Sequence, residues 1–353
     1  MKTLIKGLLV LLIFILLLAG YILKESGFFR VIKPHFEGSV EILESPPGAE
    51  DLTLDLDTGN LFVSSLNRRD SGQAGAIYLL NSNQPEESFI NLTGKLNLSQ
   101  FRPHGISLLK SEDKTFLFVI SHRDEEHVVE RFEIQGDSII NQMTFMDSLF
   151  ISPNDILAIA PTTFYITNDH GIKAGPERRI KDFLLDKNGY VVLYNGGISK
   201  RVSQHMAYAN GINISKDQKY VFVTATTEKK LFVYEKDPKE HTLCLIDQHR
   251  LGTGADNIEM DQFGNLIIGA HPQMLKFLSH AKNAVSTSSS QILKVVYLPE
   301  TDYKFLQEEL YLNDGHPLSG SSVGVYVEHG NGVNDLFIGS VFESKMLRLH
   351  RKL

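Results

Sequence analysis

The sequence contains almost no thiol chemistry and no concentrated positive charge. Its 353 residues include one cysteine, which excludes an intramolecular disulfide, a zinc–thiolate site and an iron–sulfur cluster. The formal net charge is −7 and no run of basic residues stands out, so no nucleic-acid partner is expected. Charged residues make up 22% and apolar residues 42% of the chain, values typical of globular proteins, which excludes a disordered chain. The acidic excess suits a protein that binds cations.

One long apolar run lies at the N-terminus. Residues 7–23 (GLLVLLIFILLLAGYIL) carry no charge and are flanked by Lys2, Lys6 and Lys24. As a helix this run would measure about 26 Å, which is near the thickness of a bilayer's hydrocarbon core. Residues 1–25 are therefore predicted to be a signal-anchor or transmembrane helix that binds the lipid bilayer. The lysines before the run favour a cytoplasmic N-terminus, with the rest of the chain on the extracytoplasmic side (periplasmic, extracellular or lumenal). A cleaved signal peptide, which would make the protein secreted, is the alternative, but no convincing small-residue cleavage site follows the run.

The remaining chain contains six copies of one pattern. Each copy has a polar start, an alternating strand, a turn, and a second strand rich in β-branched and aromatic residues. The copies start at residues 50, 104, 154, 210, 256 and 321. Third strands are expected at AIYLLN (76–81), VVERFEI (128–134), YVVLYN (190–195), KLFVYEK (230–236), QMLKFLS (273–279) and KMLRLHR (345–351). Fourth strands are expected at 88–92, 140–146, 200–206, 242–251 and 291–298.

Four antiparallel strands repeated about every 50 residues are typical of propeller blades. The sixth copy ends before a fourth strand, and SVEILE at 39–44 could supply that strand and close the ring. We therefore predict an all-β fold, a six-bladed β-propeller over residues 38–353, preceded by the N-terminal hydrophobic helix.

Polar residues recur at the starts of the copies, where inner strands would meet at one mouth of a central channel. Five of the six starts carry oxygen ligands or imidazole, namely Glu50, Asp51, His104, Asn154, Asp155, Asn210, Asp256 and Asn257. Carboxylate and carboxamide oxygens without a thiolate favour Ca²⁺ over zinc.

Two ion sites at different depths are predicted, because neighbouring residues of a strand point to opposite faces. One site would contain Glu50, Asn154, Asn210, Asp256 and Asn257. The other would contain Asp51 and Asp155, completed by backbone carbonyls and water. Each set has two carboxylates, which balance one Ca²⁺ each.

Histidines lie beside these acidic positions. His104 opens the second inner strand and His122 ends the strand that follows. Since imidazole titrates near neutrality, His104 is a candidate general base. Asp169, His170 and His271 occupy the same position in their own copies and are candidate residues of a substrate pocket.

The chain resembles the serum paraoxonase/arylesterase family. The matching stretches occur in the family's order and are GAEDL (48–52), PHGIS (103–107), NDI (154–156), TNDH (167–170), ANGINIS (209–215), DNI (256–258) and HP (271–272). The resemblance implies a six-bladed propeller with one catalytic and one structural calcium, and lactonase or aryl-esterase activity. It assigns the first ligand set to the catalytic ion, and Asp51, Asp155 and the carbonyl of Ile106 to the structural ion. It also makes His104 the base and His122 its supporting partner.

Two departures separate this chain from the animal enzymes. Those enzymes close the ring with a disulfide between the chain ends, whereas neither end has a cysteine here, so strand pairing is expected to close the ring. The segment after TNDH, residues 171–189, is charged and poor in aromatics, so the family's substrate preference does not carry over.

These features predict a calcium-dependent hydrolase of small-molecule lactones and aryl esters. His104, oriented by His122, would activate water, and the calcium would polarise the carbonyl. No serine-nucleophile elbow of the G-x-S-x-G type is expected, on the view that Gly320-Ser321-Ser322 lacks the second glycine. Two alternatives stay open, namely a non-catalytic membrane-tethered calcium propeller that binds ligands, and a propeller hydrolase of the gluconolactonase or phosphotriesterase type. The sequence leaves the physiological substrate and the oligomeric state undefined.

Overall fold

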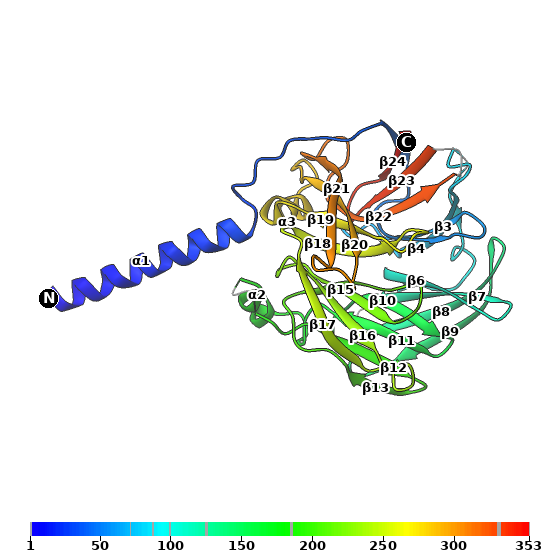
Figure 1. Ribbon diagram of the computed structural model, residues 1–353, viewed down its shortest axis with the longest axis horizontal. Helices are drawn as coiled ribbons and strands as arrows, with labels where there is room; N and C mark the ends of the chain where they lie inside the picture. Colours follow the sequence, from blue (N-terminus) through cyan, green and yellow to red (C-terminus); the bar gives the residue numbers. More distant parts are fainter. Residues whose placement is uncertain are drawn as a thin grey trace.

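The computed structural model describes residues 2–70, 72–86, 88–98, 100–123, 126–183, 186–329 and 333–352. It contains an N-terminal helix followed by six four-stranded antiparallel sheets (Figure 1). Each inner strand contacts the inner strands of the two neighbouring sheets, so the sheets form a closed ring. The predicted six-bladed propeller with an N-terminal apolar helix is confirmed.

The blades run from an inner to an outer strand. Blade 1 contains β2 (Ala49–Asp55), β3 (Asn60–Ser65), β4 (Ala76–Asn81) and β5 (Ile90–Asn91). Blade 2 contains β6 (Pro103–Ser111), β7 (Lys114–His122), β8 (His127–Gln135) and β9 (Ser138–Met146). Blade 3 contains β10 (Pro153–Ala160), β11 (Thr163–Asn168), β12 (Tyr190–Asn195) and β13 (Ile198–Arg201).

The second half of the ring follows the same order. Blade 4 contains β14 (Ala209–Ile214), β15 (Tyr220–Ala225), β16 (Lys230–Lys236) and β17 (Leu243–Arg250). Blade 5 contains β18 (Gly254–Met260), β19 (Leu266–His271), β20 (Ser290–Tyr297) and β21 (Phe305–Asn313). Blade 6 contains β22 (Ser321–Glu328), β23 (Val333–Ser340), β24 (Lys345–Lys352) and β1 (Ser39–Glu44).

Strand pairing closes the ring, as predicted. β1 pairs antiparallel with β24, from Ser39 opposite His350 to Glu44 opposite Lys345. The last blade is thus built from both ends of the propeller chain. The one cysteine, Cys244, is free and exposed on the outer strand β17.

The predicted strands of blade 5 are wrong in two places. Residues 273–279 form part of helix α3 (Met274–Lys282) rather than a third strand. Met274, Phe277 and His280 are less exposed than the residues between them. This spacing of three residues is the period of a helix and not of a strand. The segment predicted as the fourth strand is therefore the third, β20, and the fourth strand, β21, was missed. In blade 3 the outer strand also begins and ends earlier than the predicted 200–206.

The hydrophobic core lies between the blades. Each of six clusters of buried side chains joins two neighbouring blades, for example Leu157 and Tyr165 of blade 3 with Val223 and Phe232 of blade 4. The apolar faces of each sheet therefore pack against the neighbouring sheets. The polar residues at the starts of the inner strands do not belong to these contacts, and they line the channel.

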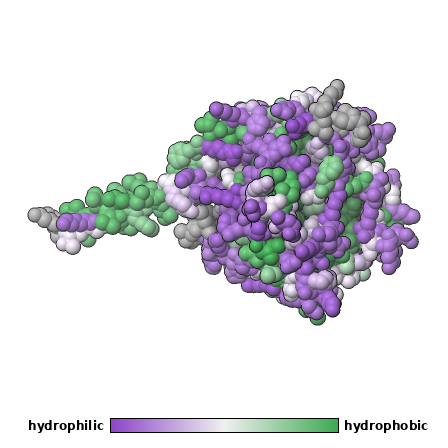
Figure 2. All heavy atoms as spheres, viewed as in Figure 1, coloured by the Kyte–Doolittle hydropathy of each residue, from purple (hydrophilic) through white to green (hydrophobic). Residues whose placement is uncertain are grey.

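Helix α1 (Lys2–Glu25) projects away from the propeller (Figure 1) and is apolar along most of its surface (Figure 2). Within the described chain, its residues 3–25 are long and apolar enough to cross a membrane, and none of this stretch is buried. The helix ends where Gly27 adopts φ +72°, with the Gly27 N–H bonded to the carbonyl of Lys24 and the Phe28 N–H to that of Leu23. This pair of bonds is the Schellman C-cap, in which glycine avoids the strain of a left-handed conformation.

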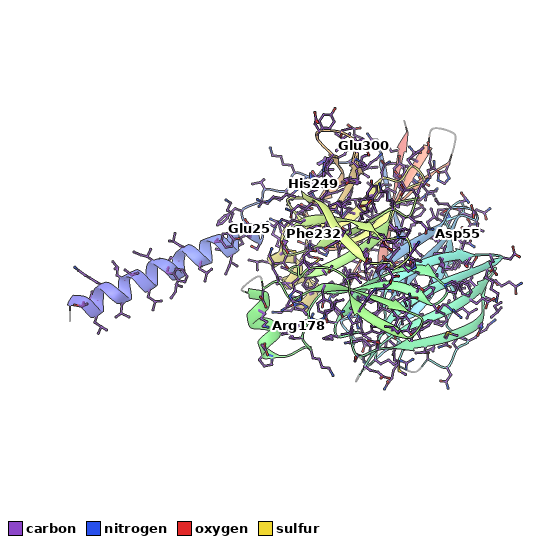
Figure 3. The ribbon with its side chains drawn as sticks, turned by 60° about the horizontal axis from the view of Figure 1, so that its bottom comes forward. Glu25, Asp55, Arg178, Phe232, His249 and Glu300 are labelled. Atoms are coloured by element: carbon purple, nitrogen blue, oxygen red, sulfur yellow. The ribbon has the colours of Figure 1, made fainter. Side chains whose placement is uncertain are left out.

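The end of α1 is attached to the propeller beside α3. The carbonyl of Ser26 accepts a 2.9 Å hydrogen bond from the Met274 N–H, and Glu25 lies 3.3 Å from Lys229. Figure 3 labels Glu25 at this junction and Arg178 on helix α2 (Pro176–Phe183), both on the side of the propeller from which α1 projects. All three helices therefore lie on one side of the ring.

Candidate active site

Every inner strand has a β-bulge near its first residue. The pairing with the second strand skips between Ala49/Asp51, Pro103/Ile106, Pro153/Ile156, Ala209/Ile212, Ala255/Ile258 and Ser321/Val323. The residues inside these skips are Glu50, His104, Gly105, Asn154, Asp155, Asn210, Gly211, Asp256, Asn257 and Ser322. A bulge leaves its residues out of the ladder and redirects their side chains. Apart from Asp51, which pairs with Ser64 in the ladder, the polar repeat starts are therefore the bulged residues themselves.

Two glycines allow the bulges of adjacent blades to pack together. A Cβ atom on Gly105 would lie 2.6 Å from the carbonyl oxygen of Asn154, and one on Gly211 would lie 2.5 Å from that of Asp256. Any larger residue would push these strands apart. The spacing of the polar side chains around the mouth depends on this close approach.

The first predicted ligand set comes together at the mouth, and we call Glu50, Asn154, Asn210, Asp256 and Asn257 the mouth cluster. All five are at most 6% exposed. The Asn257 Nδ2 donates to Oε1 and to the carbonyl oxygen of Glu50, each at 3.1 Å, across a gap of one blade. The Asn210 Nδ2 donates to Oδ1 of Asp256 at 2.6 Å.

Three carboxamide oxygens of the mouth cluster lack a partner. The Oδ1 atoms of Asn154, Asn210 and Asn257 are buried and accept no hydrogen bond from any described residue. For Asn210 and Asn257 the amide orientation is set by neighbours, since their Nδ2 groups face only acceptors. A buried acceptor without a partner is unfavourable by about 1–3 kcal/mol, so three in one cluster indicate a missing positively charged or donor group.

Glu50 is ionised at this mouth. Burial raises the pKa of Glu50, but the neighbouring His104, the Arg68 guanidinium and the Asn257 amide lower it to about 2. Nε2 of His104 lies 3.3 Å from Glu50 Oε1, and Arg68 lies 3.4 Å from Oε2. The cluster thus presents a fixed negative charge beside neutral oxygens.

The second predicted set lies in the channel, where a cavity of about 170 Å³ is lined by Asp51, Asp155 and Glu259. We call these three residues the channel cluster. The Asp51 carboxylate accepts from the Leu52 and Ile106 N–H groups at 2.9 and 2.7 Å. The Asp155 carboxylate accepts from the Ile156 and Ile212 N–H groups, both at 2.7 Å. Each aspartate therefore bridges its own blade and the next one.

The channel carboxyls repel one another. Burial, followed by the charges of Asp155, Glu50 and Glu259, raises the pKa of Asp51 well above its ordinary value. Burial also raises the pKa of Asp155, although the Ile212 and Ile156 N–H groups oppose this rise, and burial and Asp155 raise that of Glu259. A divalent cation would remove this repulsion.

The donor types fit calcium better than a nitrogen- or sulfur-seeking metal. Among the described residues, no group of three or more His, Cys, Asp or Glu side chains is arranged to hold a metal by itself. In the mouth cluster carboxamides supply three of the five side-chain donors, and Ca²⁺ accepts such neutral oxygens alongside carboxylates. The carbonyl of Ile106, a predicted ligand, belongs to a residue that lines the channel cavity.

Three histidines form a continuous chain beside the mouth cluster. Nδ1 of His104 lies 2.8 Å from Nε2 of His122, as the predicted pair requires. Nδ1 of His122 lies in turn 2.9 Å from Nδ1 of His127, which was not predicted. Burial and the neighbouring His104 and His127 lower the pKa of His122 well below its ordinary value, so this imidazole is neutral at neutral pH.

A pocket of about 850 Å³ opens next to His104. Its wall comes from the β7–β8 hairpin, the β9–β10 connection and the segment around α2, including Lys173 and Arg178. The charged segment after TNDH thus does line the site. Arg178 also lies 3.1 Å from the Asp169 carboxylate, whose other partners are His170 and the Ser152 hydroxyl.

The three predicted pocket residues are not equivalent. Asp169 lines the pocket, and although burial raises its pKa, His170 and Arg178 lower it below the ordinary value. His170 is buried behind it against Tyr208. His271 belongs to the mouth cluster's surroundings, because its Nε2 lies 2.8 Å from Asp256 Oδ2 and its ring stacks on Phe277.

The pattern G-x-S-x-G does occur, at residues 320–324 (GSSVG), so the expectation that no such motif exists was wrong. Its context is nevertheless not that of a nucleophile elbow, which needs a strand-to-helix turn. Ser322 is fully buried in the inner strand β22, and its hydroxyl donates to the carbonyl oxygen of Glu50. This serine holds blade 6 to blade 1.

Three site residues were missed from the sequence, namely Arg68, His127 and Glu259. Glu259 follows Asn257 by two residues in β18, so strand alternation could have indicated it. His127 faces His122 across the β7–β8 hairpin, which only the register shows. Arg68 lies on a loop after β3, where no periodic pattern applies.

Solved structures with the same fold include a luciferin-regenerating enzyme, with a TM-score of 0.54 and 14% identity over 88% of this chain and 95% of that one. A gluconolactonase from Xanthomonas campestris has a TM-score of 0.53 and 13% identity over 91% of this chain and 98% of its own. These likenesses concern the six-bladed fold alone.

The sequence itself places the chain in a family. Residues 47–348 match the arylesterase family model. The serum paraoxonase/arylesterase 1 of Mus musculus is 33% identical and that of Homo sapiens 31%, each over 85% of both chains. The human serum paraoxonase/lactonase 3 is 31% identical over 87% of this chain and 86% of its own. The chain belongs to the arylesterase family, confirming the resemblance, and is a carboxylic ester hydrolase.

Proposed function

We propose that this hydrolase cleaves lactones and aryl esters, with one Ca²⁺ held by the mouth cluster and a second, structural one by the channel cluster. The observation that carries this proposal is the group of three unpartnered carboxamide oxygens, from Asn154, Asn210 and Asn257, beside the His104 imidazole. The relatives named arylesterase and lactonase support the same substrate class.

The mouth cluster would bind the ion through Glu50, Asp256 and the three carboxamides. When bound there, Ca²⁺ supplies Lewis-acid polarisation of the carbonyl under attack. His104 faces the pocket and would take a proton from the attacking water. The Glu50 carboxylate, 3.3 Å from Nε2, stabilises the imidazolium that results. His122 would hold the His104 ring through its 2.8 Å hydrogen bond.

The channel cluster would serve stability rather than chemistry. Asp51 and Asp155 each accept backbone N–H groups from two blades, so a cation between them would lock these blades together. Completed by backbone carbonyls such as that of Ile106, the site would be enclosed by the protein.

We also propose that α1 anchors the enzyme to a lipid bilayer, with the propeller on the extracytoplasmic side. The helix has no buried residue between 3 and 25, and its end is attached to the propeller through Glu25, Ser26 and Gly27. A cleaved, secreted form would lose this attachment.

A substrate panel with and without calcium tests the activity. Aliphatic lactones, aromatic lactones, aryl esters and phosphotriesters are incubated with the full chain in detergent, before and after chelation. We expect lactone and aryl-ester hydrolysis that chelation abolishes and added Ca²⁺ restores. His104→Gln should reduce kcat by at least about 100-fold, whereas His249→Gln on the outer strand β17 (Figure 3) should not. Full activity under excess chelator, or hydrolysis of phosphotriesters alone, would contradict the proposal.

A further inference from the structure

His127 occupies a defined place next to the proposed base and its partner. It is the first residue of β8 and lies directly opposite His122, the last residue of β7, in the antiparallel register. The two rings are nearly perpendicular, at 88° with centroids 4.7 Å apart, and their Nδ1 atoms are 2.9 Å apart. His127 also lines the substrate pocket and is half-buried.

The three imidazoles can form only a directional chain. A neutral imidazole has one N–H donor and one acceptor nitrogen. His122 is neutral because burial and its two histidine neighbours lower its pKa. It therefore donates to one neighbour and accepts from the other, and the direction at one end fixes the direction at the other end.

One direction suits the proposed base and the other does not. His104 can accept a proton at Nε2 only if its own proton is on Nδ1, which then donates to Nε2 of His122. His122 must in that case carry its proton on Nδ1 and donate it to Nδ1 of His127. In the reverse direction, Nε2 of His122 donates to His104, whose proton then occupies the reacting nitrogen.

We propose that His127 is a positioning residue, which accepts the Nδ1–H of His122 and thereby holds His122 in the tautomer that receives the Nδ1–H of His104. This assignment rests on His104 acting as the base of the proposed function. Without an acceptor at position 127, the Glu50 carboxylate, 3.3 Å from Nε2 of His104, favours the reverse direction, in which that nitrogen carries the proton. In a serine-protease triad, replacing the orienting Asp by Asn leaves the geometry intact but lowers kcat by about 10⁴-fold, because the catalytic imidazole takes the wrong tautomer.

Two substitutions of His127 test its role as a hydrogen-bond acceptor separately from the volume of its ring. In His127→Asp an ionised carboxylate, which only accepts hydrogen bonds, can take the place of Nδ1. In His127→Leu the acceptor is lost while much of the volume remains. We expect His127→Leu to lower kcat for a lactone by at least about 30-fold with KM within about 2-fold, and His127→Asp to stay within about 5-fold of the parent. His249→Leu, on the outer strand of blade 4, is the control for loss of a histidine.

The opposite kinetic results would overturn the assignment. If both variants keep the parent kcat, His127 does not position His122 or His104 for catalysis. If both lose activity equally, or if KM rises while kcat is unchanged, His127 acts through the shape of the pocket and not as an acceptor.

A spectroscopic measurement reads the tautomer without using activity. Long-range ¹H–¹⁵N correlation spectra of histidine-labelled full chain in detergent distinguish Nδ1–H from Nε2–H, with His122 assigned by its loss in His122→Gln. We expect Nδ1–H on His122 in the parent and in His127→Asp, and its loss in His127→Leu. Nε2–H on His122 in the parent would refute the assignment even if His127→Leu does not fold. If instead the parent hydrolyses nothing in the panel, or His104→Gln remains active, the proposed function fails while the tautomer remains measurable.

Discussion

The mouth cluster and the channel cluster both come from the inner strands, where Asp51 and Asp155 directly follow Glu50 and Asn154, yet their oxygens are in opposite situations. In the mouth cluster the carboxamide oxygens accept no hydrogen bond from described residues, and the pKa of Glu50 is lowered. In the channel cluster every aspartate oxygen accepts a backbone N–H, and the pKa values of Asp51 and Asp155 are raised. In the mouth cluster, three carboxamide oxygens therefore lack a hydrogen-bond donor or a cation. In the channel cluster the aspartate oxygens already have donors, and only a compensating positive charge is missing.

Under the proposed function, this difference separates a reactive site from a structural one. Open oxygens next to a pocket allow a cation to be held while a substrate oxygen approaches. Oxygens already bonded to two blades fix the strands, and a cation there compensates charge. The following changes test the comparison, from the largest expected effect to the smallest.

Glu50→Gln should give the largest loss of activity. It removes the ionised carboxylate beside His104 while keeping its size and its hydrogen bond with Asn257. We expect kcat for a lactone to fall by at least about 100-fold, the scale of losing one electrostatic partner of a transition state. The calcium-free variant should also be less stable at neutral pH, because it loses the ionised contacts with His104 and Arg68. Steady-state kinetics and urea unfolding measure the two effects.

The exposed Glu300 (Figure 3) provides the matched control, since Glu300→Gln removes the same charge from the outer surface. A similar loss in both variants would show that net charge, and not the mouth cluster, governs activity. Parent-level activity in Glu50→Gln would remove Glu50 from the site.

Asp155→Ala should have the largest effect on stability. The substitution leaves the buried N–H groups of Ile156 and Ile212 without an acceptor. At about 1–3 kcal/mol for each buried group, the free energy of unfolding should fall by about 2–6 kcal/mol. Asp155→Asn keeps one acceptor oxygen, leaves the other N–H without an acceptor and removes the charge, so in calcium-free buffer it should be about half as destabilising. Equal destabilisation by the two variants would show that charge and not the hydrogen bonds holds the blades.

The two clusters should give stability opposite dependences on pH. Asp51, Asp155 and Glu259 bind protons more tightly in the native state than when unfolded, so in calcium-free buffer their contribution falls as pH rises above about 4 through their raised pKa values. Glu50, with a pKa of about 2, contributes stability that is complete above its ordinary 4.5 and is lost as pH falls toward 2.

Urea unfolding between pH 4 and 8, with and without calcium, measures this dependence. The decrease with rising pH should be smaller in Asp51→Asn than in the parent, and calcium should abolish it in both. An identical slope in parent and variant would assign the decrease to other groups.

The ring, the inner strands and most site residues followed from the sequence because one pattern recurs six times with polar residues at the same position. Repetition made Asn154 or Asp256 recognisable where a single residue would have been ambiguous. The strand-to-helix exchange at Met274 was missed because the assumed repeat outweighed a short helical period. His127 and Arg68 were missed since neither belongs to the repeated pattern, and only the folded hairpin and loop bring them to the site.

The bulges were missed for a related reason. Strict alternation predicted different sites for Glu50 and Asp51, but the ladder skips here, so the alternation does not hold for pairs such as Asn154 and Asp155, which both lie inside a skip. A bulge leaves little local signature beyond a glycine, here Gly105 and Gly211, whose need is visible only when the next blade is present.

Thr226→Val should have the smallest effect, a loss of calcium affinity confined to the mouth cluster. The buried Thr226 hydroxyl accepts a 2.9 Å hydrogen bond from Asn210 Nδ2 and donates to the carbonyl of Ala255. Valine keeps the shape but removes one of the two acceptors that turn the Asn210 oxygen toward the mouth. One such bond contributes about 0.5–1.5 kcal/mol, so the calcium concentration for half-maximal activity should rise by about 2- to 12-fold.

The same variant should leave calcium's effect on unfolding largely intact, because the channel cluster does not contact Thr226. Calcium titrations followed by activity and by thermal unfolding compare the two responses in one sample. If both shift together, the two clusters bind cations as one coupled unit, and the separation between an open mouth and a structural channel fails. If only activity shifts, carboxamide orientation at the mouth is set by the acceptors that hold the amide nitrogen.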